Sequence, residues 1–288
     1  MENKTNSRAF MIINCLALMI IAANLTSPVH EATHMLTQMA AGMKPEFLGF
    51  GINSTVGTVS VDMNSFFWKL MYEGSAALMN VAVGFILLLI LSKIKFGPLS
   101  RVLVLMLTIM HLSMGFGYFL RDGIAYSPNN GMGDWCKVLD RFDGSIALRI
   151  GMLVVGSAGI LLTFYIAYRQ AYHFIKNNND KKERNTVASA LYLFPFILFS
   201  VIYTLLGLVS PLAAEIGAVN SLIFGAITNI FGMITFFWGY MFTAVMVKPM
   251  KKSIYYFSPC ADRKIILWIG AAALLLFDVF VLCPGIYF

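Results

Sequence analysis

The chain has 288 residues, of which 59% are hydrophobic and only 12% are charged, and its formal net charge is +7. Soluble domains have about a quarter of their residues charged, so this composition excludes an ordinary soluble protein. A disordered chain is excluded as well, because 14% of the residues are aromatic and disordered chains are poor in aromatic residues. We therefore expect a membrane protein, in which the position of each charge matters more than the sum.

Seven apolar stretches are long enough to cross a bilayer as helices, which takes about 20 residues. They cover residues 9–27, 67–92, 99–121, 145–172, 187–209, 219–247 and 264–284. The sequence therefore predicts an all-α polytopic membrane protein with about seven transmembrane helices.

The basic residues predict how this chain is oriented in the membrane. If the N-terminus is cytoplasmic, 15 of the 21 lysine and arginine residues fall in segments on the cytoplasmic side. Because such residues are enriched on that side, we expect the N-terminus inside and the C-terminus outside, most simply in the cell membrane. The same distribution gives no reason to expect nucleic acid as a partner, and the sequence leaves the oligomeric state open.

Two segments interrupt the apolar pattern and suggest a division of the chain. The polar run at 177–185 predicts a hinge at the inner face, between a membrane core at 1–176 and a three-span accessory region at 186–288. Within the core, residues 46–64 contain Val, Thr and Ser in alternation, with Gly and Asn as breaks. That pattern is typical of a short β-hairpin rather than a helix.

The most informative motif is His30, Glu31 and His34 in the pattern His-Glu-x-x-His. On a helix, residues four apart share one face, so both imidazoles can reach one metal ion. The glutamate between them can act as the general base on water activated by that metal. We therefore predict a zinc-binding helix at 29–42. The alternative is an ordinary helix start with polar residues, since Pro28 favours a helix beginning there.

A catalytic zinc site takes a third protein ligand and keeps a fourth position open. Two candidates follow the third span, on the same predicted side as the histidines. We favour Asp134, which lies among glycines, although an Asp there can also be a helix N-cap. Asp122 is the alternative, and Asp122-Gly123 is also a turn sequence. Glu73 is a further candidate, or else an acid that reaches the membrane interface.

Asn80 lies within the second predicted span, where an amide needs a hydrogen-bonding partner. It can bond to another helix, or it can face the metal pocket and help to stabilise an oxyanion. We therefore count Asn80, with Glu31, as a candidate catalytic residue.

Together these features resemble the site-2 protease family of intramembrane zinc metalloproteases. The residues that carry the resemblance follow the family's order along the chain: His30-Glu31-x-x-His34, the β-like segment 46–64, Gly74…Asn80 and an Asp about one hundred residues past the metal motif. The resemblance covers roughly residues 10–150. The family's Ala-Gly-Pro-x-x-Asn has Ser75 in place of its Pro, and of the family's Asn-x-x-Pro-x-x-x-x-Asp-Gly only Asp122-Gly123 is present.

The resemblance implies a zinc metalloendopeptidase that hydrolyses membrane-spanning or membrane-anchored proteins. It assigns zinc to His30, His34 and an Asp, with Glu31 as the general base, and it suggests that substrate pairs with a strand edge in 46–64. Two other functions are open to a chain of this composition. One is a transporter with a proton or ion path along His30, Glu31, His111 and Asp278; the other is a non-catalytic relative that binds membrane proteins.

Overall fold

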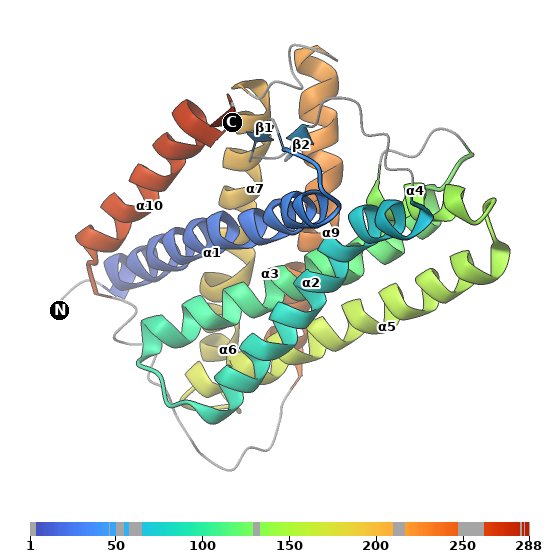
Figure 1. Ribbon diagram of the computed structural model, residues 1–288. Helices are drawn as coiled ribbons and strands as arrows, with labels where there is room; N and C mark the ends of the chain where they lie inside the picture. The colour runs from blue at the N-terminus through green and yellow to red at the C-terminus, as the bar shows by residue number, and fades with distance from the viewer. Residues whose placement is uncertain are drawn as a thin grey trace.

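The computed structural model describes residues 4–45, 47–49, 55–57, 65–128, 133–209, 217–246, 262–282, 284 and 286–287, and within them the chain is almost entirely helical (Figure 1). The α-helices are α1 (Lys4–Ala40), α2 (Phe66–Lys93), α3 (Pro98–Ala125), α4 (Asp134–Arg141), α5 (Ile146–Ala171), α6 (Lys181–Ala188), α7 (Phe194–Leu206), α9 (Ala218–Val245) and α10 (Ile265–Phe277). Single turns of 3-10 or π-helix extend them at Tyr172–Phe174, Ser189–Leu193, Gly207–Val209 and Asp278–Leu282.

Six helices in the described part of the chain are long and apolar enough to cross a membrane. They are Arg8–Ala40, Phe66–Lys93, Pro98–Ala125, Ile146–Phe174, Lys181–Val209 and Ile265–Leu282. The prediction of an all-α multi-pass membrane protein is therefore confirmed, with six such helices rather than seven. The remaining predicted span, 219–247, corresponds to α9, of which the shorter portion Ile234–Val245 is found as an apolar helix.

Helix α1 unites two segments that the sequence separates. The predicted span at 9–27 and the predicted metal-motif helix at 29–42 form one continuous helix of 37 residues with Pro28 inside it. A proline within a helix removes one backbone hydrogen bond, and this is usually where a helix begins or bends. Here the chain continues through Pro28, so His30 and His34 lie in the last third of a helix that the first span begins.

The front and back parts of the chain share one hydrophobic core. Helix α1 lies against α2 and α3 and also against α7 and α10 (Figure 1). The largest cluster of buried apolar side chains combines Met19 of α1 and Leu105 of α3 with Phe236 of α9. The predicted hinge at 177–185 ends in helix α6, whose first residues are capped by Asp180. The last three spans therefore pack directly on the helices that hold the metal motif.

Helices α2 and α3 approach closely where small residues face each other. A methyl group at Gly115 of α3 would lie 2.7 Å from the carbonyl oxygen of Ala77 in α2. Only glycine at position 115 allows the two backbones to come this close. The close approach brings the turn of α2 that contains Asn80 against the turn of α3 that contains His111.

A small sheet lies beside the helices. Strand β1 (Phe47–Gly49) pairs antiparallel with β2 (Thr55–Gly57) and with β3 (Ile286–Tyr287), in the order β2-β1-β3. The first two strands lie in the segment 46–64 for which we predict a hairpin, and the rest of that segment lies outside the described residues. Figure 1 shows β1 next to the C-terminus of the chain.

Candidate metal centre

Helix α1 presents His30 and His34 from consecutive turns of one face, as the spacing predicts. Both side chains are buried, with exposed fractions of 1% and 5%, and their Nε2 atoms lie 3.3 Å apart. Nδ1 of His34 donates to the backbone carbonyl of Tyr72 in α2 at 2.7 Å. This bond places the proton of a neutral His34 on Nδ1, which leaves Nε2 as a lone-pair donor toward the centre.

Asp134 completes a group of three. It is the first residue of α4, and its Oδ2 lies 3.1 Å from Nε2 of His30 and 3.2 Å from Nε2 of His34. Zinc binds such ligand atoms at about 2.0–2.1 Å, and two corners of a tetrahedron of that size are about 3.3–3.4 Å apart. The three atoms thus have close to the spacing of three corners of a zinc tetrahedron, and this buried group could bind a metal ion.

The protonation of Asp134 suits this arrangement. Burial by itself would raise the pKa of the carboxyl group, but the hydrogen bonds with His30 and His34 and the attraction of their charges hold that pKa well below its ordinary value. The carboxylate is therefore ionised at neutral pH, the state that a metal ligand requires.

Asp122 supports the helix that presents Asp134. Its Oδ2 accepts a hydrogen bond from the backbone N–H of Trp135 at 2.9 Å, and its Oδ1 accepts from Nε of Arg121 at 2.7 Å. The intervening Gly133 passes so close that a methyl group there would lie 2.3 Å from both carboxylate oxygens. Asp122 thus caps the start of α4 and is occupied with Arg121, while Asp134 faces the histidines.

Glu73 is also engaged away from the centre. Its carboxylate binds the guanidinium of Arg141 at 2.8 Å, and this ion pair joins α2 to the last residue of α4. Both ends of the short helix α4 are therefore fixed by buried acids from neighbouring helices, and the group of possible ligands in the described residues consists of His30, His34 and Asp134.

Glu31 lies beside the three ligand atoms. Its side chain is buried, with an exposed fraction of 4%, and its Oε1 is 4.0 Å from Nε2 of His30. A carboxylate at this distance is close enough to share a water molecule with a metal held by the histidines.

Asn80 lies behind His30 rather than on the side that faces Asp134. The Asn80 amide is 2.9 Å from Nδ1 of His30 through its nitrogen and 2.9 Å from Nδ1 of His111 through its oxygen. The two halves of the amide have nearly the same size, so a half-turn of the group satisfies both contacts with the roles exchanged. In that orientation Nδ1–H of His30 donates to Oδ1, which leaves Nε2 of His30 for a metal. The oxyanion role of Asn80 stays a prediction, while its contacts assign it to holding His30.

Sequence reasoning missed the aromatic neighbours of the motif. The ring of Tyr118 stacks on His30 with centroids 4.8 Å apart, and the guanidinium of Arg121 lies 4.3 Å above the Tyr118 ring. Tyr118 follows His111 by seven residues, which is two helical turns, so a stripe of α3 facing α1 was detectable in principle. The contact between His34 and Tyr72 has no such signal, because it is made by a backbone carbonyl.

Comparison with known proteins adds no further constraint: no family model, curated protein or solved structure matches the chain. His30, His34 and Asp134 form a buried group in a protein with several membrane-spanning helices, and that group could bind a metal ion.

Proposed function

We propose that this protein is a membrane-embedded zinc metalloendopeptidase, a divergent relative of the site-2 proteases, that hydrolyses membrane-spanning or membrane-anchored proteins. The observation that carries the proposal is the triangle of His30 Nε2, His34 Nε2 and Asp134 Oδ2, with sides of 3.1, 3.2 and 3.3 Å. Two imidazoles and one carboxylate are a ligand set used by catalytic zinc, which leaves one position open.

The surroundings of the ligands support zinc as the metal. Imidazole nitrogen and carboxylate oxygen suit zinc, whereas calcium and magnesium prefer oxygen ligands alone. Each histidine is also held through its second nitrogen, His34 by the carbonyl of Tyr72 and His30 by the amide of Asn80. Such contacts are typical of metal-binding histidines, because they fix the ring and the tautomer.

The chain's own residues can carry the proton transfers of peptide hydrolysis. A bound zinc ion supplies a Lewis acid and makes a water molecule more acidic. Glu31 accepts a proton on its carboxylate as the water oxygen bonds to the scissile carbonyl carbon. The same carboxylic acid then gives that proton to the leaving nitrogen as the C–N bond breaks. Because Glu31 is buried, bulk water does not compete for that proton.

The basic residues support an orientation for this enzyme. With the N-terminus in the cytoplasm, the end of α1 that carries the metal group lies toward the outer side of the cell membrane. The C-terminus is then also outside, provided that α9 crosses the membrane as a seventh span in addition to the six long apolar helices. Lys95→Cys and Lys137→Cys test this orientation when each is introduced into a variant whose four native cysteines are replaced by alanine and labelled in intact cells with a membrane-impermeant maleimide. We expect labelling at position 137 only, and labelling at position 95 only would reverse the topology.

Metal analysis of the purified full-length protein tests the proposal. We expect close to one zinc per wild-type chain, loss of zinc in His34→Ala and retention of zinc in Glu31→Ala. Cleavage of a membrane-anchored reporter is lost in both variants. The matched control is His173→Ala, because His173 lies in a single helical turn after α5 and is not part of the ligand group. A wild-type protein purified without zinc that also fails to take up added zinc would refute the proposal.

A further inference from the structure

His111 is a buried histidine that the proposed chemistry does not use. It lies in the middle of α3, one of the helices long enough to cross a membrane, and its exposed fraction is 2%. Within the described residues it is not part of the ligand group, yet its Nδ1 lies 2.9 Å from Oδ1 of Asn80. An ionisable side chain at this depth in a membrane is costly, so its contact calls for an explanation.

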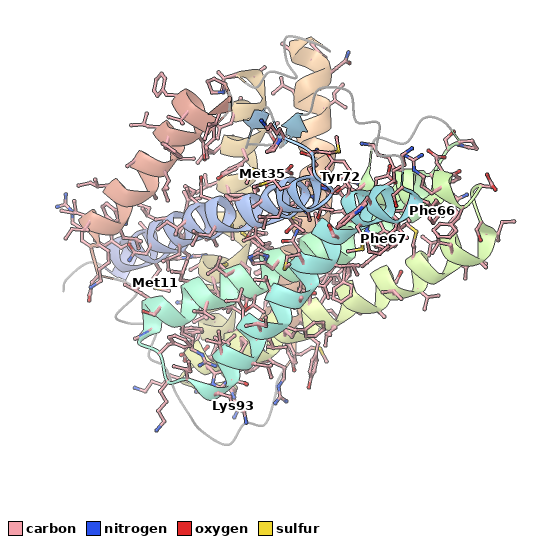
Figure 2. The ribbon with its side chains drawn as sticks, viewed as in Figure 1. Met11, Met35, Phe66, Phe67, Tyr72 and Lys93 are labelled. Carbon is pink, nitrogen blue, oxygen red and sulfur yellow. The ribbon has the colours of Figure 1, made fainter. Side chains whose placement is uncertain are left out.

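Asn80 connects His111 to the metal centre. Figure 2 labels Tyr72 on α2, and the carbonyl of Tyr72 holds His34 of α1. Asn80 follows Tyr72 by about two turns of the same helix, and the nitrogen end of its amide is 2.9 Å from Nδ1 of His30. The side chains of His30, Asn80 and His111 therefore form one hydrogen-bonded chain across α1, α2 and α3.

The Asn80 amide couples the proton positions of the two imidazoles. Its nitrogen only donates hydrogen bonds and its oxygen only accepts them, whereas Nδ1 of a neutral histidine either carries a proton or does not. The amide nitrogen needs an Nδ1 without a proton, and the amide oxygen needs an Nδ1 with one. While both rings are neutral, His30 and His111 consequently have opposite states at Nδ1.

Each orientation of the amide suits a different state of His30. With the amide nitrogen toward His30, the proton of that ring is on Nε2, which lies 3.1 Å from the accepting carboxylate of Asp134. With the amide oxygen toward His30, the proton is on Nδ1, and the lone pair of Nε2 is available to a metal. Zinc binding requires the second orientation, in which the amide nitrogen faces His111 and needs an acceptor there.

We propose that His111 is a positioning residue of the metal centre and that zinc binding at His30 switches its tautomer. In the zinc-bound protein, Nδ1 of His111 accepts from the Asn80 amide and the His111 proton is on Nε2. In the zinc-free protein, the His111 proton is on Nδ1 and is donated to Oδ1 of Asn80. Neither ring gains or loses a proton overall, because in each ring the proton moves from one nitrogen to the other. This inference rests on the proposed zinc site, and it assigns a role to a residue outside the ligand group.

A histidine suits this position because the membrane interior has no water to satisfy the amide. An imidazole offers either a donor or an acceptor at the same atom without moving its ring. An apolar residue in place of His111 would leave the Asn80 N–H unsatisfied in the zinc-binding orientation. A buried C=O without a partner is tolerated more readily than such an N–H. The amide would then favour donation to His30, which keeps the His30 proton on Nε2 and opposes zinc binding.

NMR of the full-length protein, labelled with nitrogen-15 histidine and held in detergent, measures this switch. The chain has four histidines, and a ring nitrogen that carries a proton resonates far from one that does not. Spectra are recorded after chelation and after addition of one equivalent of zinc, at a pH where the imidazoles are neutral. The signals that disappear in His111→Asn belong to His111. In the wild type we expect the His111 proton on Nδ1 without zinc and on Nε2 with zinc.

Asn80→Asp is the matched variant for the coupling. A carboxylate has nearly the shape of the amide, but it only accepts hydrogen bonds. It accepts from Nδ1–H of His30 in both states, so zinc should still bind. It also accepts from Nδ1–H of His111, so the His111 proton should stay on Nδ1 with and without zinc.

Zinc affinity tests the positioning role separately. His111→Asn places an amide close to the position of Nδ1, where it can accept from Asn80, and it should bind zinc as tightly as the wild type. His111→Leu should bind zinc about fivefold more weakly, as the loss of one net hydrogen bond implies. Competition with a zinc-binding dye measures both variants.

The possible failures are distinguishable. If the signals of His30 and His34 respond to zinc while the His111 tautomer stays the same, zinc binds and the inference is overturned. It is also overturned if His111 switches in Asn80→Asp, or if His111→Asn loses as much zinc affinity as His111→Leu. If no histidine signal responds to zinc, the zinc protease proposal itself fails, and the role of His111 fails with it.

Discussion

Gly133→Ala should disrupt the metal centre without touching a ligand. The backbone of Gly133 has φ of −123° and ψ of 156°, which alanine adopts freely, so any effect comes from the added methyl group. That methyl would lie 2.3 Å from both oxygens of Asp122, and the carboxylate must move by roughly 1 Å to restore van der Waals contact. This movement breaks the 2.9 Å bond that caps α4 at Trp135.

The expected magnitude follows from that lost contact. Loss of a helix N-cap costs about 1 kcal/mol of unfolding free energy, and loss of a hydrogen bond to a charged group costs about 1.5–3 kcal/mol. Because Asp134 is the next residue, its displacement should weaken zinc binding by about 10–100-fold, as changes around metal ligands do.

Competition with a zinc-binding dye and thermal unfolding of the detergent-purified protein measure these two effects. Gly151→Ala in α5 is the matched control, since a methyl group there would meet nothing within 4 Å, and it should keep the wild-type zinc affinity. If Gly133→Ala also binds zinc as tightly as the wild type, Asp122 does not position Asp134 and the reasoning is refuted.

Three further predictions concern the same centre. Asp134→Asn should lose zinc, whereas Asp122→Asn should retain most of it, because an amide oxygen can still cap α4; metal analysis of both variants distinguishes the two aspartates, and the reverse pattern would make Asp122 the ligand. Asn80→Asp should keep zinc, because it still accepts from His30, while Asn80→Leu should bind zinc about 10–100-fold more weakly; equal losses in both would argue against a positioning role. Arg141→Met leaves the buried acid Glu73 without its partner and should lower the unfolding free energy by about 1–2 kcal/mol, after allowance for the exposure of the arginine. Adding Glu73→Gln to Arg141→Met should restore part of that loss, and a double-mutant cycle in thermal unfolding that shows simple additivity would contradict the coupling.

Much of the fold was predictable because the bilayer restricts the choices. An apolar stretch of about 20 residues in a chain with so few charges has little alternative to a membrane-spanning helix. The ends of the helices were harder to predict where two helical segments follow each other directly, as at 9–27 and 29–42. Pro28 indicated the start of a separate helix, yet α1 runs through it from Lys4 to Ala40. Tertiary contacts hold α1 on both sides of the proline, with Asn24 bonded to Tyr203 of α7 and His30 in contact with Asn80 of α2.

The candidate metal centre was also predictable in part from the sequence. The spacing of His30 and His34 placed them on one helical face, since that relation is local and set by the helix repeat. The choice of Asp134 rather than Asp122 as the third ligand depends on contacts between residues far apart in the chain. Both follow the third span, and only the docking of α4 against α1 and α3 shows which carboxylate faces the histidines and which one caps the helix.

The sequence by itself determined that this protein is a helical membrane protein and that one helix carries two histidines and a glutamate in metal-binding order. Hydropathy and helical periodicity depend only on neighbouring residues, so both can be recognised in the sequence without knowledge of the fold. Only the tertiary structure decided that Asp134 joins the histidines and that Asn80 and His111 lie behind His30. These relations join residues 31 to 104 positions apart in the chain, which meet only because close helix packing brings α2, α3 and α4 against the end of α1.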